Sequence, residues 1–345
     1  MPDEPTTPTE DIPEGDGIFG LHEDPDSAAV TLIPVPYDAT TSYRPGTRFG
    51  PEAIRRASCQ IDLHDARFGD VWRAGIAMEP IDPDLLKLSE RVRPAAERIM
   101  LAADGGSAED RRVLDEAGDH VNAFVAERTR RVIRAGRVPG VIGGEHSVPY
   151  AAIGACAQTG PIGVLHIDAH WDLRPAYLGM HWSHASIIHN AMRDVDHITR
   201  LVSVGVRDAS LEEWNASRAL GGRLRAFTGR DLADASFTGK PWDETCAEIV
   251  AALPERVYIT FDIDGLEPAL CPNTGTPVPG GLSFEQVSRL LEHIARSGKR
   301  LVGFDLVEVA PGPGFPEAPD GIDAIVGARA LYRLIGAATA GMRNA

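Results

Sequence analysis

The chain has 345 residues, of which 43% are hydrophobic and 24% charged, a mixture typical of folded globular proteins. Its 34 lysines and arginines stand against 50 acidic residues, and the net charge of −16 argues against a nucleic-acid partner, because phosphate contacts need a basic surface. The sequence has no run of roughly 18 to 20 apolar residues that could span a membrane, and Met1 is followed by acidic, proline-rich residues and not by a signal sequence. We therefore expect a cytoplasmic protein without a membrane or nucleic-acid partner.

The first 28 residues are rich in proline and acidic residues and have almost no aliphatic periodicity. Such a composition offers too little apolar surface to fold by itself. We predict an acidic, proline-rich N-terminal arm over 1–28 without secondary structure, followed by one α/β domain over 29–345.

From residue 30 onwards, short apolar runs alternate with amphipathic helical stretches. Strands are predicted at 30–36, 138–142, 162–167, 201–206, 257–263 and 301–307, helices at 120–135, 284–296 and 328–340, and loops at 104–107 and 310–322. Several strands are apolar on both faces, which is typical of a buried parallel sheet. The alternation predicts a single three-layer α/β domain, with a central, mostly parallel sheet and helices on both faces.

The predicted helix at 284–296 has recognisable end signals. Ser283 is its expected N-cap, Gln286 completes a capping box, and Gly298 ends the helix. The apolar side chains that it should bury recur at the spacing of one helix face: Val287, Leu290, Leu291 and Ile294.

The four cysteines are far apart and form no CxxC pair, so neither a zinc knuckle nor a disulfide framework is indicated. We expect buried free thiols at all four positions: Cys59, Cys156, Cys246 and Cys271.

Histidine and aspartate gather directly after three of the predicted strands. In a parallel α/β sheet, the ligand site lies at the carboxyl ends of the strands. The three segments are VIGGEHS with His146, VLHIDAHWD with Asp168, His170 and Asp172, and YITFDIDGLEP with Asp262 and Asp264. Alternate residues of a strand share one face, so each group begins by pointing the same way.

Four carboxylates in one buried crevice would repel each other unless cations were present. Two divalent ions nearly balance four carboxylates and a bridging hydroxide, and ions of such a pair lie about 3.5 to 4 Å apart. Because Asp168 and Asp172 would be about 13 Å apart in an extended strand, the chain must curl out of the sheet near residues 169–171. Caps, turns and surface ion pairs are the alternative interpretation, but they explain three such clusters less well.

The ligand types also restrict the metal. Oxygen-rich ligands with two imidazoles suit Mn²⁺, with Ni²⁺, Co²⁺ or Fe²⁺ as alternatives, whereas structural zinc usually recruits cysteine.

Taken together, these motifs resemble those of the ureohydrolase family, which includes arginase and agmatinase. The matching segments, in the family's order, are YRPGTRFGPEAIR, GGEHS, DAHWD, FDIDGLEP, TGTPVPGGLS and VGFDLVEV. The resemblance covers about residues 30 to 334 and is closer to the agmatinase branch than to arginase. It implies an arginase-like fold and hydrolysis of a guanidino compound to urea and an amine by a hydroxide that bridges two metal ions.

The resemblance also implies a role for each matching residue. His146, Asp168, Asp172 and Asp262 would bind one Mn²⁺, and His170 and Asp264, with the shared Asp168 and Asp262, the other. Glu308 would pair with the guanidinium, Thr276 would donate a hydrogen bond near it, and His184 would carry a proton to the leaving amine, a role that suits a pKa near 6.5. His181 and His189 compete with His184; we interpret His181 as a pocket or surface residue and His189 as a core histidine.

The segment after DAHWD departs most from the family pattern and would line the route of the substrate tail. It supplies Arg174, Tyr177 and Trp182. A cation at Arg174 suits a carboxylate on the tail and would repel the ammonium of agmatine, unless Arg174 pairs with a local acid. The substrate thus stays open among agmatine, a guanidino acid and guanidine.

Two other functions remain as alternatives. One is a formimino or amide C–N hydrolase on the same scaffold, and the other is a catalytically silent metal-binding homologue. The family resemblance further implies a homo-oligomer, either a trimer or a hexamer, with only a small molecule as substrate.

Overall fold

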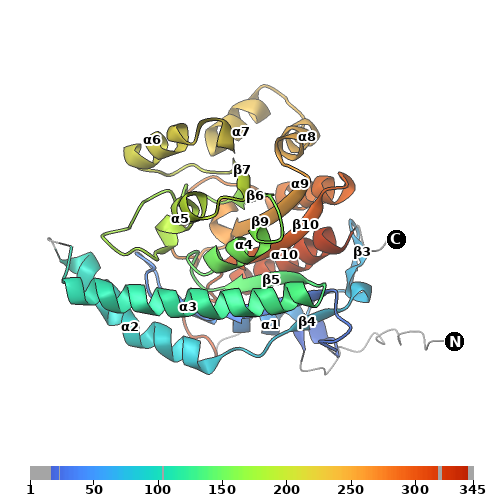
Figure 1. Ribbon diagram of the computed structural model, residues 1–345. Helices are drawn as coiled ribbons and strands as arrows, with labels where there is room; N and C mark the ends of the chain where they lie inside the picture. Colours follow the sequence, from blue (N-terminus) through green and yellow to red (C-terminus); the bar gives the residue numbers. More distant parts are fainter. Residues whose placement is uncertain (1–16, 23, 103–104, 318–320, 341–345) are drawn as a thin grey trace.

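A parallel sheet of eight strands forms the centre of the molecule (Figure 1). The computed structural model describes residues 17–22, 24–102, 105–317 and 321–340. Across the sheet the order is β4-β1-β5-β10-β9-β6-β7-β8, and every neighbouring pair is parallel. The strands are β1 (Val30–Val35), β4 (Ile76–Met78), β5 (Val138–Gly143), β6 (Ile162–Ile167), β7 (Ile198–Val204), β8 (Leu224–Phe227), β9 (Arg256–Asp262) and β10 (Arg300–Val307). A separate antiparallel pair joins β2 (His64–Asp65) and β3 (Gly69–Asp70).

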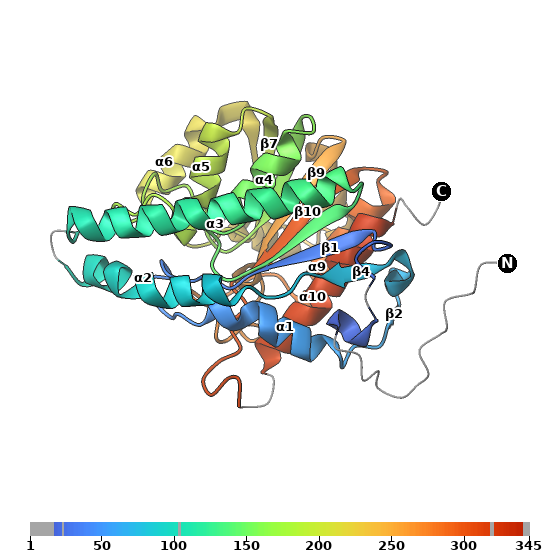
Figure 2. The ribbon, with the colours of Figure 1, turned by 60° about the horizontal axis from the view of Figure 1, so that its bottom comes forward.

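Helices cover both faces of this sheet, as Figure 2 shows for α3 on one side of β1 and for α1 and α10 on the other. One apolar core includes side chains of α2 (Pro83–Leu101), α3 (Ala108–Arg134), α4 (Tyr150–Ala157) and α5 (Ile187–Asp194). The other includes side chains of α1 (Gly50–Ser58), α8 (Trp242–Ala252), α9 (Phe284–Arg296) and α10 (Ile322–Thr339). Two further helices, α6 (Leu211–Ala219) and α7 (Gly229–Phe237), flank β8 in the chain. The predicted three-layer α/β domain is therefore confirmed.

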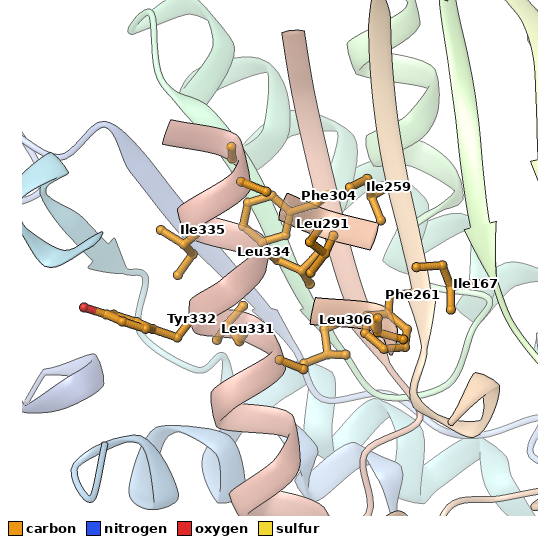
Figure 3. Close-up of a cluster of buried hydrophobic side chains, with 14 of the residues drawn as sticks. Ile167, Ile259, Phe261, Leu291, Phe304, Leu306, Leu331, Tyr332, Leu334 and Ile335 are labelled. Atoms are coloured by element: carbon orange, nitrogen blue, oxygen red, sulfur yellow. The ribbon is translucent and has the colours of Figure 1, made fainter. Parts of the chain in front are cut away.

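The two cores, one on each face, explain why the central strands are apolar on both faces. Figure 3 shows Phe304 and Leu306 of β10 beside Leu331 and Leu334 of α10. All four side chains are fully buried, and burial of each stabilises the fold by about 1.5 to 3 kcal/mol relative to exposure. This apolar core thus supports the loops that follow these strands.

The helix α9 has the bounds and the caps that its sequence predicts. The Ser283 hydroxyl oxygen accepts from the Gln286 N–H at 3.2 Å, and the Gln286 side-chain oxygen accepts from the Ser283 N–H at 2.9 Å. Gly298 has φ +78°, the left-handed conformation that ends many helices.

Other elements differ from the predictions. The strands β4 and β8 have only three and four residues and escaped prediction because so short a run carries little periodicity. The predicted helix 120–135 is the second half of α3, and α10 begins at Ile322 and not at residue 328. In α3 the first turns carry charged residues that weaken the apolar pattern, whereas α10 begins at the last residue of the predicted loop 310–322.

Part of the predicted N-terminal arm is structured. Residues 1–16 lie outside the described part, but Ile18–Gly20 form a 3₁₀ turn, contrary to our expectation of no secondary structure. The Phe19 N–H donates to the Ser58 hydroxyl oxygen at 2.7 Å, and its ring lies 4.9 Å from that of Tyr332. Two apolar side chains in an otherwise polar stretch are enough to anchor it.

Three of the four cysteines, Cys156, Cys246 and Cys271, are buried free thiols as expected, whereas Cys59 is only half-buried. Among the helices of the described residues, none combines the length and the apolar character needed to cross a bilayer.

Candidate metal centre and active site

Four neighbouring strands bring the predicted site residues together. In the sheet order β5-β10-β9-β6, His146 follows β5, Glu308 follows β10, Asp262 ends β9 and Asp168 follows β6. Because parallel strands end at one edge, residues far apart in the sequence converge there. Asp172 has φ +51°, so the chain does leave the extended conformation after β6, as the spacing of Asp168 and Asp172 requires.

The imidazole of His146 lies at the centre of a first ligand group. Its Nδ1 lies 2.9 Å from Asp168 Oδ2, 3.0 Å from Asp172 Oδ2 and 3.4 Å from Asp262 Oδ2. Within the described part of the chain, this buried Nδ1 has no hydrogen-bond partner of suitable geometry. A nitrogen and carboxylate oxygens that lie this close without forming hydrogen bonds are arranged as ligands of a common cation would be.

A second ligand group shares Asp168. His170 Nδ1 lies 3.1 Å from Asp264 Oδ2 and 3.5 Å from Asp168 Oδ1. Asp264 Oδ1 accepts from the Ala169 N–H at 3.0 Å, and Asp264 N–H donates to Asp262 Oδ1 at 2.8 Å. The two groups are thus built around one shared carboxylate, which suits a pair of ions better than two separate sites.

A buried chain of hydrogen bonds supports His146 from behind, and the sequence did not reveal it. Thr260 donates its hydroxyl hydrogen to Asp305 Oδ1 at 2.9 Å, and His146 Nε2 lies 2.9 Å from the same hydroxyl oxygen. Because this oxygen must accept from the imidazole, the neutral form of His146 carries its proton on Nε2, which leaves the lone pair of Nδ1 available to a cation. Such support is typical of metal-binding histidines.

His166 is a further residue that the sequence analysis missed. It lies inside β6 and is fully buried, with Nε2 2.9 Å from Asp168 Oδ2 and Nδ1 3.2 Å from the Ser203 hydroxyl. The alternation of strand side chains places it on the face of Asp168, which was the available signal. It precedes the end of the apolar run, so the pattern alone predicts an ordinary strand residue.

The electrostatics of the cluster favour positive charge. Burial and the neighbouring Asp264 and Asp168 hold the pKa of Asp262 well above its usual range. Burial alone would lower the pKa of His146, but the carboxylates of Asp168, Asp172 and Asp262 outweigh it and raise that pKa. Divalent cations would supply the positive charge that these groups otherwise take from protons. The residues therefore fit two divalent cations.

Glu308 presents an unpaired oxygen to the site. Its backbone has φ +61°, a conformation that costs a residue other than glycine roughly 1 to 2 kcal/mol. Oε1 accepts from the His146 N–H at 2.8 Å, whereas Oε2 is buried and has no partner in the described residues. A β-carbon at Gly275 would lie 3.2 Å from Oε2, so glycine there leaves room for the carboxylate.

His184 lies in the 3₁₀ turn His184–Ser186, and its side chain is held by two hydroxyl groups. Its Nδ1 lies 3.4 Å from Thr40 Oγ1 and its Nε2 3.2 Å from Ser42 Oγ. Burial lowers the pKa of His184 to about 3, which corrects our expectation of a value near 6.5. At physiological pH the imidazole is therefore neutral and can accept a proton.

Glu145 organises the loop that faces His184, a role that the sequence did not suggest. It is fully buried and accepts from the Thr40 N–H and hydroxyl, both at 2.7 Å, and from the Ser147 hydroxyl at 2.6 Å. Burial raises the pKa of Glu145 to about 7. Its effect on the site runs through Thr40, which contacts His184.

A cavity of about 390 Å³ opens beside the two ligand groups. Two sets of residues line it. The metal-group residues with Glu308, Thr276 and His184 form what we call the metal end, and the tail end consists of Arg174, Tyr177, Asp208, Ser210 and Glu213. The Thr276 hydroxyl also donates to Asp264 Oδ2 at 3.4 Å.

Trp182 does not line this cavity, which corrects its expected place beside the substrate. Its indole packs against Gly118, where a β-carbon would lie 2.5 Å from the ring, and its ring centre is 4.7 Å from that of Tyr150. The indole N–H donates to Asp119 Oδ1 at 2.8 Å. The residue thus fixes the loop to α3. His181 and His189 also lie outside the cavity lining.

Arg174 lines the cavity but is paired. Its Nη2 lies 3.2 Å from Glu213 Oε2, and the same oxygen accepts from the N–H and the hydroxyl of Ser210 in the capping box of α6. The local-acid alternative for Arg174 is therefore the one observed. Asp208, an exposed residue, also lines the cavity, so the tail end carries two formal negative charges and one positive charge.

The fold and the site together define an α/β protein whose carboxyl sheet edge is suited to a pair of divalent cations. Comparison with known proteins gives the family: the arginase family's sequence model matches residues 28–336. This chain belongs to the arginase family.

Individual relatives agree with that assignment. N(1)-aminopropylagmatine ureohydrolase of Thermus thermophilus is 34% identical over 300 residues, which cover 86% of this chain and 88% of that protein. Agmatinase of Bacillus anthracis is 32% identical over 292 residues, 84% of this chain and 86% of that one. The solved structure of proclavaminate amidino hydrolase from Streptomyces clavuligerus matches with a TM-score of 0.72 at 26% identity, covering 94% and 97% of the two chains. The expectation of a hydrolase similar to the agmatinase branch is confirmed.

Proposed function

We propose that this protein is a two-metal amidinohydrolase that cleaves a C–N bond of a guanidino compound and releases urea and an amine. The observation that carries the proposal is the geometry at His146. Its buried Nδ1 lies within 3.4 Å of three carboxylate oxygens, while its Nε2 is fixed by Thr260. This arrangement has no counterpart in a cap or an ordinary ion pair, where the nitrogen would donate a hydrogen bond to one oxygen.

Metal binding would involve the two ligand groups, which share Asp168 by their contacts and Asp262 by the resemblance to ureohydrolases. The first is His146, Asp168, Asp172 and Asp262, and the second is His170, Asp264 and the shared Asp168 and Asp262. When bound, two divalent ions would lower the pKa of a water molecule so that it becomes a nucleophile near neutral pH. Mn²⁺ suits this oxygen-rich set, with Ni²⁺ or Co²⁺ as alternatives.

The groups around the cavity suit a guanidinium. Glu308 offers a buried, unpaired carboxylate oxygen, and a charge-assisted pair with a planar guanidinium both orients the carbon and offsets its charge. Thr276 adds a hydroxyl at the same end of the cavity. His184 begins as a neutral imidazole and accepts a proton, which it then passes to the leaving amine.

The substrate tail would be cationic. The charge of Arg174 is offset by Glu213 at 3.2 Å, so it offers little to a carboxylate, and Asp208 adds a negative charge to the same wall. Among the substrates that the sequence left open, this charge balance favours a cationic tail over a guanidino acid. The names of the agmatinase and aminopropylagmatine ureohydrolase relatives agree with a tail of this kind.

The remaining parts of the proposal come from the resemblance to ureohydrolases. They are a homo-oligomer, either a trimer or a hexamer, a small-molecule substrate without nucleic acid or membrane, and a place in the cytoplasm.

A urea-release screen tests the proposal. The purified chain would be loaded with Mn²⁺ or Ni²⁺ and assayed with agmatine, arginine, 3-guanidinopropionate, 4-guanidinobutyrate, guanidine and formiminoglutamate. We expect urea from agmatine at the highest kcat/KM. Formamide without urea would support the formimino hydrolase, and release of neither product by metal-loaded protein would overturn the enzymatic function.

A further inference from the structure

Arg207 is a half-buried cation whose guanidinium donates to main-chain carbonyls. It lies after β7 at the carboxyl edge of the sheet, three residues beyond Val204. In the part of the chain that the structure describes, no carboxylate forms an ion pair with its guanidinium, which donates to main-chain carbonyls instead. Removing a guanidinium from water costs free energy, which its hydrogen bonds to these carbonyls must offset.

The carbonyls belong to the two loops beside the metal groups. Nη2 donates to Asp264 O at 2.7 Å, to Leu266 O at 3.1 Å and to Val278 O at 2.9 Å. Nε donates to Pro279 O at 3.2 Å. One planar group thus ties the loop that carries Asp264 to the loop that follows Thr276.

The main chain of Arg207 reaches the third segment of the site. Its N–H donates to Ala169 O at 2.8 Å, and Ala169 lies between Asp168 and His170. The Ala169 N–H in turn donates to Asp264 Oδ1. Arg207 therefore contacts both backbone segments that supply the second ligand group.

Glycines make this close approach feasible. A β-carbon on Gly281, which has φ +114°, would lie 2.5 Å from Leu266 O and 2.9 Å from Arg207 Nη2. Gly280, with φ +84°, lies against the arginine side chain as well. The loop between Thr276 and α9 is shaped so that its carbonyls can surround the guanidinium.

We propose that Arg207 is a positioning residue that holds Asp264 and His170 in register, and so sets the affinity of the second ligand group for its metal ion. The first group, around His146, has separate support from Thr260 and Asp305. Lysine cannot replace the arginine, because a point-like ammonium on a flexible stem cannot span carbonyls of several segments at once. The inference rests on the proposed two-metal centre.

The test compares Mn²⁺ binding by the full metal-free chain and by Arg207→Lys and Arg207→Gln, measured by calorimetric titration and by metal content after gel filtration. Arg223 provides a matched control, because its guanidinium also donates to carbonyls, those of Met192 and Ile198, but at the amino end of β7. We expect both Arg207 variants to keep one Mn²⁺ at wild-type affinity and to bind the second at least about tenfold more weakly. Arg223→Lys should bind both as the wild type does.

A spectroscopic readout separates positioning from general stability. The electron paramagnetic resonance of wild-type protein should show a spin-coupled Mn²⁺ pair, replaced by a mononuclear signal in the Arg207 variants at one equivalent per chain. Wild-type affinity for both ions in these variants would overturn the proposal. So would equal weakening of both ions, or failure of both variants to fold while Arg223→Lys folds, since Arg207 would then serve the fold as a whole. Absence of a second ion in the wild type would instead contradict the two-metal centre itself.

Discussion

The two ends of the cavity differ in how deeply their charged residues are buried and in which elements carry them. At the metal end, His146, Asp168 and Asp264 are buried on strand ends and each is held by further buried groups. At the tail end, the side chain of Arg174, in a loop, is 38% exposed, although its partner Glu213 at the start of α6 is buried. Charges at the buried end are expensive to change, whereas charges near the surface are screened by water. The difference teaches that the reaction type is fixed by the sheet and the substrate by the loops.

The largest effect is expected at the shared carboxylate. Asp168→Asn removes a charge from both ligand groups, so the protein should lose bound metal, and kcat/KM should fall by about 10³-fold, equivalent to roughly 4 kcal/mol of transition-state stabilisation. Metal content and urea release measure both effects, with Asp196→Asn at an exposed position as the control. Two bound ions per chain in Asp168→Asn would contradict the role of Asp168 as a shared ligand, and with it the distinction between the metal end and the tail end.

A smaller effect is expected at Glu308, which belongs to the metal end but not to the ligand groups. Glu308→Gln keeps the shape and removes the charge, and the lost charge-assisted pair of about 1.5 to 3 kcal/mol should lower kcat/KM by about 10². Metal content should remain unchanged, which separates this variant from Asp168→Asn. A change of less than about threefold in kcat/KM would rule out contact with the guanidinium.

The support behind His146 offers a more graded test. Thr260→Ala leaves Nε2 of His146 and Oδ1 of Asp305 without their shared hydroxyl, so Mn²⁺ affinity should fall by about 10- to 100-fold. Thr260→Ser retains the hydroxyl and should bind Mn²⁺ as the wild type does. Equal affinities in the alanine and serine variants would show that the chain of hydrogen bonds does not tune the metal.

The smallest effect belongs to the tail end. Glu213→Gln leaves Arg174 uncompensated. Because the Arg174 side chain is partly exposed, a change of about 1 kcal/mol should raise kcat/KM for 4-guanidinobutyrate relative to agmatine by about fivefold. Glu212→Gln, at the exposed neighbouring position, is the control. An unchanged ratio would mean that the Arg174–Glu213 pair does not discriminate between anionic and cationic substrate tails.

The sequence predicted the metal end better than the tail end for a physical reason. His146, Asp168 and Asp262 each follow a buried apolar run, and parallel strands bring such positions to one edge whatever the loops do. The bounds of α9 were predictable too, because its caps are local. These features depend on neighbours within a few residues of the chain.

What the sequence did not reveal depends on contacts between distant segments. Thr260 and His166 looked like ordinary strand residues, and their partners, Asp305 and Ser203, lie 45 and 37 residues away. The pairing of Arg174 with Glu213 and the packing of Trp182 on α3 likewise required the tertiary structure. The sequence gives the charge of a side chain, but only the tertiary structure gives the residue with which it pairs.

The place of β10 in the sheet has a consequence for how the chain is made. It is the last strand of the sheet in chain order, yet it pairs with β5 on one side and β9 on the other. Between Gly143 and Val307 a ribosome adds about 160 residues, which takes roughly 8 to 30 s at ~5–20 residues per second. Through that interval the edge of β5 stays open, and the nascent chain must be protected from pairing with other chains. Synthesis that stops before residue 300 should therefore yield aggregates and not a smaller folded unit.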